Sequence, residues 1–377
     1  MTDLQEIRKQ IDEVDEQIVR LFERRMKLTK EVAEYKIATG KPVFDAQRER
    51  KKLETLGEKA TDPFNCVGIR EVFRQLMSIS RKRQYQLLSE SGVSYQSEFH
   101  KVDRLPTKDA KVVFQGVEGA YSFAAMNTYF GPEVDSFHVE TWKDAMEAIA
   151  EGKADYAVLP IENSTAGIVA DIYDLLVEYQ NNIVGQQIIR ADHVLMGLPG
   201  VSLSDLKLVC SHPQALKQCG RYLEAHPGWK QQEMINTAVA ARKVKEDGKK
   251  EQAAIGSRHA AEYFGLEILD DNISSSQTNS TRFIIVSGKK LYTPDADKIS
   301  ICFELPHASG TLYNMLSHFI YNNLNMTKIE SRPIAQKNWE YRFFVDFEGN
   351  LDDGAVKNAL LGIEKEASSL RVLGNYR

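Results

Sequence analysis

Apolar residues spaced alternately three and four apart run through the first 35 positions of the chain. They are Leu4, Ile7, Ile11, Val14, Ile18, Leu21, Leu28, Val32 and Tyr35, with Arg25 set in the same row. No glycine or proline precedes Gly40, so the pattern predicts one helix of about 35 residues, roughly 50 Å long, with a heptad seam. One copy of such a helix cannot cover its own seam.

Arg25 is the anomaly in this row, because a guanidinium keeps its charge and its burial demands an anionic partner. The next predicted helix has the stripe Ala46, Glu49, Leu53, Leu56 and Ala60. One interpretation is an internal Arg25–Glu49 ion pair that fixes the register of the helices. However, Lys36 lies about 20° round the helix from Arg25, and Arg48 precedes Glu49. These three cations outnumber Glu49 and the nearby Asp45, so a shared site would need an anionic ligand.

A third helix is predicted to begin at Asp62-Pro63, where a capping residue precedes proline at the first helical position. Its apolar stripe carries Ser80 and Gln84, one turn apart on the same face. These two side chains could simply bond to backbone carbonyls. Together, the three helices direct several polar groups inward.

At these residues the segment 4–88 resembles the all-helical chorismate mutases. Pro42-Val43-Phe44-Asp45, leading into Arg48-Glu49-Arg50, belongs to the resemblance. The site residues that it carries over are Arg8, Arg25, Lys36, Asp45, Arg48, Glu49, Ser80 and Gln84. Rearrangement of chorismate to prephenate is pericyclic and needs no nucleophile. The protein has to hold a flexible dicarboxylate in its reactive conformer and stabilise the charge that grows on the ether oxygen.

The resemblance implies a role for each residue. Arg8, Arg25 and Arg48 would hold carboxylates, for which a guanidinium fork is well matched. Lys36 and Gln84 would donate to the ether oxygen.

Asp45, Glu49 and Ser80 would hold the ring hydroxyl or orient other groups. Arg8 lies 17 residues before Arg25, roughly 25 Å along the helix, too far to share its pocket. The resemblance implies that Arg8 reaches the partner's site in an intertwined homodimer.

Composition and charge exclude several functional classes of protein. A net charge of −5 and a pI near 6.0 offer no broad positive surface for nucleic acid or membranes. Four cysteines lack paired metal-ligand spacing, and no metal site is expected. They are typical of reduced thiols, and no apolar run of 18 residues or signal pattern occurs, so we expect a cytoplasmic protein.

Beyond residue 109, short apolar runs alternate with helical stretches, which predicts an α/β architecture with crossover connections. The runs are 112–114, 157–159, 208–210, 253–255 and 283–286. Several are followed by small or hydroxyl residues, as at Ser122, Thr237 and Ser257. Each alone is best interpreted as a helix cap, but gathered at strand ends they predict an anion cleft. The turn from Gly116 to Gly119 lacks the third glycine of a dinucleotide fingerprint, so neither NAD nor another cofactor is expected.

Residues 111–287 resemble the prephenate dehydratases. The marks are Pro160-Ile161-Glu162-Asn163-Ser164, Ser211-His212-Pro213-Gln214 and Asn279-Ser280-Thr281-Arg282-Phe283. The resemblance implies two α/β lobes of the periplasmic-binding-protein type, with the substrate in the cleft. The chain would leave one lobe, build the other and return near Thr281.

Prephenate loses carbon dioxide and hydroxide together, so the protein must hydrogen-bond or protonate the departing hydroxyl. The resemblance implies this role for Thr281, which we treat as a positioned donor because a threonine hydroxyl is a very weak acid. Glu162 or a bound water would supply the proton. The other expected site residues are Asn163, Ser211, Arg282 and Phe283. No nucleophile elbow is present, so a hydrolase triad is not expected.

Residues 298–377 have the order βαββαβ, which is ferredoxin-like. The segment resembles the ACT regulatory domains, and Glu330-Ser331-Arg332-Pro333 matches the mark of the phenylalanine-binding type. Gly310-Thr311-Leu312 stands where that family has Gly-Ala-Leu. The resemblance implies phenylalanine as an allosteric inhibitor.

The sequence therefore predicts a multidomain enzyme: a chorismate mutase (1–90), a linker (91–109), a prephenate dehydratase (110–288) and an ACT domain (297–377). It would convert chorismate to prephenate and prephenate to phenylpyruvate in phenylalanine biosynthesis, as a homodimer or higher homo-oligomer. Two alternatives stay open. The dehydratase could prefer arogenate, or the chain could be a non-catalytic sensor of a small carboxylate.

Overall fold

The computed structural model describes residues 3–271, 273–275, 279–308, 310–334, 337 and 339–377. The chain forms two compact units. The first contains Met1–Glu98 and Ile301–Val372, and the second contains Phe99–Ser300 and Leu373–Arg377. Among the described residues, no helix is long and apolar enough to cross a membrane.

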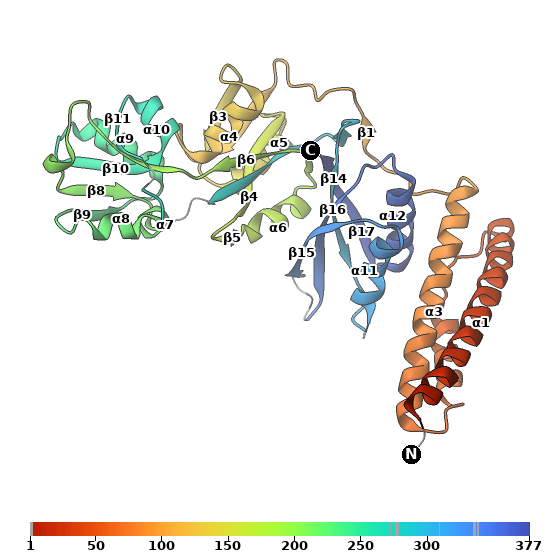
Figure 1. The fold of residues 1–377 in the computed structure, drawn as a ribbon. Helices are drawn as coiled ribbons and strands as arrows, with labels where there is room; N and C mark the ends of the chain where they lie inside the picture. The colour runs from red at the N-terminus through yellow and green to blue at the C-terminus, as the bar shows by residue number, and fades with distance from the viewer. Residues whose placement is uncertain (1–2, 272, 276–278, 309, 335–336, 338) are drawn as a thin grey trace. The chain divides into compact units, whose positions relative to one another are not determined.

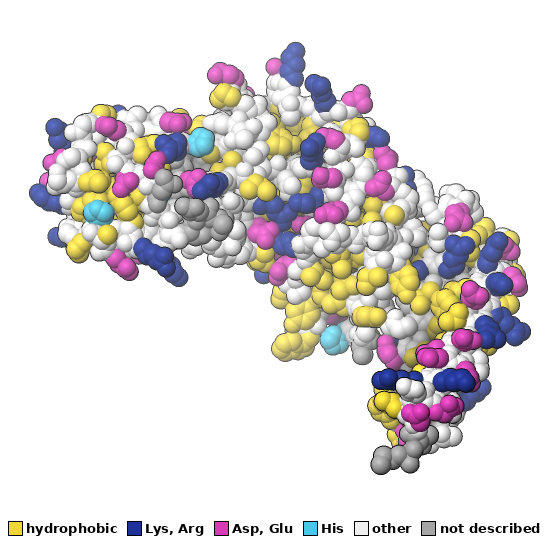
Figure 2. Space-filling model, in the orientation of Figure 1, with side chains coloured by type: hydrophobic (Ala, Val, Ile, Leu, Met, Phe, Trp, Pro, Cys, Tyr) yellow, Lys and Arg dark blue, Asp and Glu magenta, His cyan; other side chains and the backbone are white. Residues whose placement is uncertain are grey.

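The N-terminal helices are α1 (Leu4–Thr39), α2 (Ala46–Gly57) and α3 (Pro63–Glu90), as the periodicity predicted. Each begins at an aspartate, because Asp3, Asp45 and Asp62 accept backbone N–H groups of the first turn. Gly40 ends α1 in the left-handed conformation with φ 67°. Both α1 and α2 pack on α3 (Figure 1). Lys, Arg, Asp and Glu side chains are interspersed over the visible face of these helices (Figure 2).

The apolar seam of α1 is exposed over its N-terminal half. Leu4, Ile7, Ile11, Val14, Ile18 and Leu21 are between 40% and 63% exposed. The opposite end of the helix contacts α3 through the buried Thr29 and Ala33. The long helix therefore offers a continuous apolar surface that a single chain leaves uncovered.

The rest of the first unit has the predicted βαββαβ order. Its elements are β14 (Lys298–Glu304), α11 (Thr311–Tyr321), β15 (Met326–Pro333), β16 (Tyr341–Glu348), α12 (Gly354–Glu366) and β17 (Ser369–Tyr376). The strands lie in the order β15-β16-β14-β17. Gly362 lets α11 and α12 approach closely, because a Cβ there would lie 2.4 Å from the His318 ring. Helix α12 also packs on α3, so this region and the N-terminal helices share a core.

A buried ion cluster joins the two parts of this unit. Arg81 of α3 binds Glu49 of α2 and Glu366 at the end of α12. Burial opposes the charged form of Glu366, but His318 and the Arg81 guanidinium favour it more strongly and lower its pKa to about 2. The ionised carboxylate therefore stabilises the packing of α12 on α3.

The second unit has two lobes. The first has strands β2 (Lys111–Gln115), β3 (Asp135–Val139), β4 (Tyr156–Asn163), β6 (Asn182–Arg190) and β12 (Ser280–Ser287), in the order β6-β12-β4-β2-β3. Its helices are α4 (Tyr121–Phe130), α5 (Trp142–Ala150) and α6 (Ala170–Glu178). Strand β2 is parallel to β3 and β4, whereas β12 is antiparallel to β4 and β6. The short strand β5 (Gly167–Ile168) pairs with β4.

The second lobe has the strand order β11-β7-β10-β8-β9. The strands are β7 (His193–Gly197), β8 (Leu208–Ser211), β9 (Lys230–Glu233), β10 (Gln252–Ser257) and β11 (Glu267–Asp270). The helices are α7 (Pro213–Gln218), α8 (Gly220–Glu224), α9 (Thr237–Asp247) and α10 (Arg258–Phe264), with the short 3-10 helix η1 (Leu203–Asp205). Ser257 caps α10, as the simpler interpretation of these strand-end residues expected. That interpretation was wrong for the other two residues: α9 is capped by Asn236 instead of Thr237, and Ser122 lies inside α4 and donates to the Gln115 carbonyl.

The chain path between the lobes agrees with the predicted return near Thr281. It leaves the first lobe at β6, builds the second from β7 to β11 and returns in β12. Strands β6 and β7 were not predicted, because two glutamines interrupt the apolar residues of β6 and no helix separates the two strands. Residues 91–109 were predicted to be a linker, whereas β1 (His100–Lys101) there pairs with β13 (Leu291–Tyr292).

Acid should remove the stabilisation that Glu366 provides. Its pKa of about 2 lies below the ordinary 4.5, a difference equivalent to roughly 3 kcal/mol at neutral pH. The pKa of Glu366 is lower in the folded chain than in the unfolded chain. Its contribution to stability is therefore fully present well above pH 4.5 and is lost as the pH falls toward 2. We expect the difference in opening free energy between the native chain and Glu366→Gln to shrink by roughly 1 kcal/mol between about pH 7 and pH 3.5.

Amide hydrogen exchange of α3 and α12, corrected for its intrinsic pH dependence, measures this difference. Glu364→Gln is the matched control, because Glu364 is an exposed carboxylate on the same helix. Parallel pH curves for the native chain and Glu366→Gln would contradict the assignment.

Candidate active sites

A cavity of about 340 Å³ opens between the three N-terminal helices. Seven of the eight residues predicted for the helical site line it: Arg25, Lys36, Asp45, Arg48, Glu49, Ser80 and Gln84. Arg8 does not line it, and its side chain is exposed near the start of α1. The helical spacing of the sequence thus brings most of the predicted set to one place.

Arg25 is half-buried and bound to neutral oxygens. Its Nη1 donates to the carbonyl of Leu76 at 2.7 Å and also to Ser80 Oγ. Burial lowers the pKa of Arg25, and the charge of Glu49 opposes this shift. The guanidinium is therefore partly desolvated without a carboxylate in direct contact among the interactions of the described residues, which favours binding of an anion.

Glu49 does not form the internal pair with Arg25 that one interpretation of the sequence expected. Its two oxygens accept from Arg81 Nη1 at 2.7 and 2.5 Å. Arg81 follows Ser80 in α3 and is buried. The sequence analysis missed Arg81, because its second partner, Glu366, is 285 positions away.

Lys36 adds a second cation at the cavity. Its Nζ donates to the carbonyl of Val43 at 2.7 Å. Burial and then the charge of Arg48 lower the pKa of Lys36, while Asp45 and Glu49 act in the opposite direction. Mutual repulsion between Lys36 and Arg48 is relieved when an anion binds between them.

Ser80 and Gln84 bond to the backbone of their own helix, as the simpler interpretation expected. Ser80 Oγ donates to the Leu76 carbonyl at 2.8 Å, and Gln84 Nε2 donates to the Ser80 carbonyl at 3.2 Å. The Oε1 atom of Gln84 is buried and lacks a hydrogen-bond partner among the described residues. This side chain therefore keeps unused hydrogen-bonding capacity beside the cavity.

In the second unit, Thr281 and Asn163 face each other on β12 and β4. Asn163 Nδ2 donates to Thr281 Oγ1 and to Asn279 Oδ1, both at 2.9 Å. Asn163 Oδ1 accepts from the backbone N–H groups of Thr165 and Ala166. The amide is thus oriented by the loop after β4, and it leaves the Thr281 hydroxyl hydrogen to be donated elsewhere.

Arg282 and Glu162 occupy the neighbouring rung of the same strand pair. Arg282 Nη2 donates to Glu162 Oε2 at 2.9 Å. Because successive side chains of a strand point to opposite faces, this ion pair and the Thr281–Asn163 pair lie on opposite faces of the sheet, at the same ends of β4 and β12.

Two further predicted residues lie elsewhere. The Phe283 ring is in the hydrophobic core of the first lobe. Ser211 is fully buried in the second lobe, where its Oγ donates to the Ile255 carbonyl at 2.6 Å. Both side chains are engaged in packing or backbone bonding and not beside Thr281.

A polar chain that the sequence analysis missed connects this site to the second lobe. Asn279 Nδ2 donates to Gln218 Oε1 at 3.0 Å, and Gln218 Nε2 donates to Thr165 Oγ1 at 3.1 Å. His193 Nε2 lies 2.8 Å from Gln218 Oε1, and its Nδ1 lies 2.9 Å from the Tyr121 hydroxyl. Burial lowers the pKa of His193, so the ring is neutral, with Nε2 as donor and Nδ1 as acceptor.

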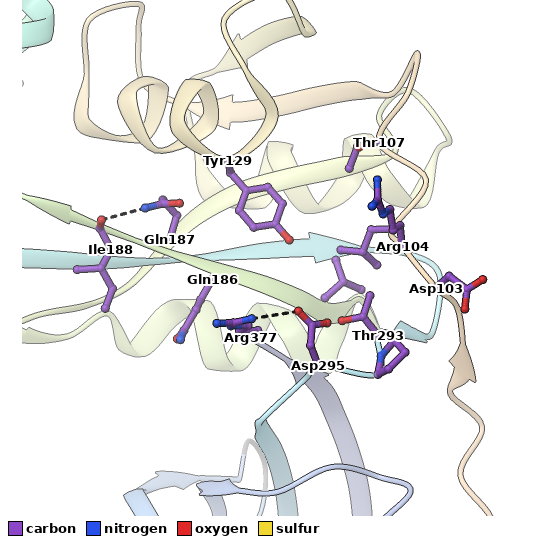
Figure 3. A pocket seen from close by; sticks show the side chains of 13 residues that line it. Asp103, Arg104, Thr107, Tyr129, Gln186, Gln187, Ile188, Thr293, Asp295 and Arg377 are labelled. Atoms are coloured by element: carbon purple, nitrogen blue, oxygen red, sulfur yellow. Dashed lines mark hydrogen bonds and ion pairs between the residues drawn. The ribbon is translucent and has the colours of Figure 1, made fainter.

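Another cavity of the second unit, about 920 Å³, is separate from these residues. Figure 3 shows Tyr129, Gln186 and the ion pair of Arg377 with Asp295 beside it. None of the residues predicted from the sequence lines it.

In the βαββαβ region, Thr311 and Leu312 line a cavity of about 360 Å³ together with Trp339. Gly310 precedes them with φ 80°, a conformation that glycine adopts without strain. Glu330, Ser331, Arg332 and Pro333 end strand β15 and pair with β16. They do not line this cavity.

Comparison with known proteins assigns a family to the N-terminal helices and to the two-lobed region. A family model for chorismate mutase type II matches residues 7–85, and a model for prephenate dehydratase matches residues 112–291. The bifunctional chorismate mutase/prephenate dehydratase of Enterobacter agglomerans is 32% identical over 98% of this chain and 95% of its own length.

Two further relatives cover the region after the helices. Arogenate dehydratase/prephenate dehydratase 2 of Arabidopsis thaliana is 37% identical over 71% of this chain and 72% of its own length. The crystal structure of prephenate dehydratase from Arthrobacter aurescens in complex with L-Phe is 30% identical, with a TM-score of 0.65 over 71% of this chain and 89% of that one. Together with the helical pocket and the two-lobed unit, these matches show that the chain belongs to the family of bifunctional chorismate mutase/prephenate dehydratases, as an enzyme with both activities.

Proposed function

We propose that the helical cavity is the chorismate mutase site, with Arg25, Arg48 and Lys36 as its cations. The main support is that Arg25 contacts only neutral oxygens among the interactions of the described residues, while Glu49 is bound by Arg81. The cations are thus left to bind the two carboxylates of chorismate.

Within this cavity, Lys36 and Gln84 would donate to the ether oxygen as its bond breaks. Asp45, Glu49 and Ser80 would orient the ring hydroxyl and the neighbouring cations. The site acts by selecting the compact conformer of a flexible dicarboxylate, because the rearrangement itself needs no protein nucleophile.

A second copy of the chain would complete this site. The exposed seam of α1 offers the apolar surface for a homodimer, and Arg8 lies on the exposed part of the same helix, where it could reach the partner's cavity. Removing this seam from water in each copy would favour association strongly, because buried apolar area contributes about 25 cal/mol per Å².

For the dehydratase, we propose that Thr281 donates its hydroxyl hydrogen to the departing hydroxyl of prephenate. Asn163 supports this role, because it donates to Thr281 Oγ1 and so orients the hydroxyl. Arg282 binds Glu162 on the neighbouring rung. This ion pair favours the ionised form of Glu162, so a bound water, rather than Glu162, supplies the proton. A preference for arogenate is the alternative, since one plant relative carries both activities in its name.

We also propose that phenylalanine inhibits the enzyme by binding the βαββαβ region, our expected ACT domain at 297–377. The cavity beside Gly310, Thr311 and Leu312 and the L-Phe complex of the Arthrobacter relative support this. The other proposed boundaries are 1–90 for the mutase, 91–109 for the linker and 110–288 for the dehydratase.

The four cysteines are free thiols, which supports a reducing compartment, the cytoplasm, as the location of the protein.

The two activities should be separable by substitution. Arg25→Ala should lower chorismate turnover by about 10²-fold or more and leave prephenate turnover intact, because it removes a charged donor from one site only. Thr281→Ala should have the converse effect, of similar size. Chorismate consumption and the absorbance of phenylpyruvate in alkali measure the two reactions.

Matched controls are available for both substitutions. Arg24→Ala changes an exposed neighbour of Arg25 and should leave both rates unchanged, and Thr281→Ser keeps the hydroxyl. Unimpaired dehydration in Thr281→Ala would remove this residue from its proposed role. Faster turnover of arogenate than of prephenate would establish the alternative substrate.

Phenylalanine should lower the dehydratase rate of the native chain. Gly310→Ala should weaken this inhibition and leave the uninhibited rate unchanged, because a Cβ at φ 80° strains the loop. Titration of prephenate turnover with phenylalanine measures the inhibition. If phenylalanine weakens the binding of prephenate by some factor, prephenate should weaken the binding of phenylalanine by the same factor. Equal rates with and without phenylalanine would refute the regulation.

A further inference from the structure

Arg81 forms a double fork at the wall of the helical cavity. Its side chain is 6% exposed. Nη1 donates to both oxygens of Glu49, while Nε and Nη2 donate to the two oxygens of Glu366 at 2.8 and 3.2 Å. The ring of Phe44 covers the guanidinium, with its centroid 4.9 Å from Cζ. Arg81 is thus fixed on three sides and fixes the direction of the Glu49 carboxylate in turn.

Glu49 and Arg81 separate two cavities. Both residues line the mutase cavity of about 340 Å³ and a second cavity of about 280 Å³. The second cavity is also lined by Thr311 and Glu366 of the βαββαβ region. The chorismate mutase model ends at residue 85, so Glu366 lies outside the part of the chain that this family model describes.

Two sets of cations compete for the Glu49 carboxylate. On one side is Arg81, and on the other are Arg25 and Lys36, whose ionisation Glu49 already influences. A Glu49 released from Arg81 would pair with Arg25, because a partly desolvated guanidinium attracts the nearest carboxylate. That pairing would occupy the cation that a substrate carboxylate needs.

We propose that Arg81 is a positioning residue of the mutase site, which holds Glu49 away from Arg25 and is itself fixed by Glu366 of the C-terminal region. This rests on the proposed assignment of Arg25 and Glu49 to that site. The last helix of the regulatory region thereby contributes to chorismate binding without touching the substrate.

The test is the KM for chorismate in full-length variants. Arg81→Met should raise KM by about tenfold or more, because Glu49 then competes with the substrate for Arg25. Adding Glu49→Gln should bring KM back toward the native value, since an amide carries no competing charge, while kcat stays low through loss of Glu49 itself. A purely structural role of Arg81 would not produce this reversal.

Three companion variants sharpen the test. Arg81→Lys keeps a cation but binds fewer oxygens, so KM should rise by about threefold, again reversed by Glu49→Gln. Glu366→Gln should also raise KM by about threefold, because the guanidinium loses one charged anchor. Arg83→Met, an exposed arginine two residues along α3, should leave KM unchanged. Amide hydrogen exchange of α3 and α12 reports the folding of the first unit, and prephenate turnover, a property of the second unit, should be the same throughout.

An unchanged KM in Arg81→Met, or a raised KM that Glu49→Gln fails to lower, overturns the proposal. If Arg81→Met does not fold, the Arg81→Lys pair decides by the same two criteria. An unchanged KM in Glu366→Gln removes the C-terminal region from the inference. Failure of the mutase assignment is distinguished by Arg25→Ala, which would then retain chorismate turnover.

Discussion

The arrangement of the proposed mutase site depends on which cation holds Glu49. Arg81 binds both oxygens of this carboxylate, so Arg25 is left with the Leu76 carbonyl and the Ser80 hydroxyl as partners. A buried ion pair has a large desolvation cost and needs good geometry to offset it. The double fork of Arg81 supplies that geometry, and it keeps positive charge available for a dianionic substrate.

The same guanidinium connects parts of the chain that are far apart in sequence. Glu366 at the end of α12 completes the cluster, and its low pKa reflects how strongly the ionised form is stabilised there. Close packing of α12 through Gly362 and Leu361 brings it to this position. The catalytic helices and the C-terminal region of the first unit thus share one electrostatic core.

The proposed dehydratase site uses neutral hydrogen bonds to orient its side chains. Asn163 is oriented by backbone amides of the loop after β4, and it in turn orients the Thr281 hydroxyl. Asn279, Gln218 and the neutral His193 continue the chain into the second lobe. Each donor has a defined acceptor, which gives the two lobes a fixed polar contact near the reacting group.

The sequence by itself determined the helix periodicity, the Asp62 cap, the inward polar residues and the order of the modules, because these are local patterns. It also placed Thr281 and Asn163 in one site. Only the tertiary structure decided that Glu49 pairs with Arg81 rather than Arg25, since the second anchor of Arg81 is 285 positions away. It likewise placed Ser211 and Phe283 in the interior, because burial depends on which distant segments pack over each strand.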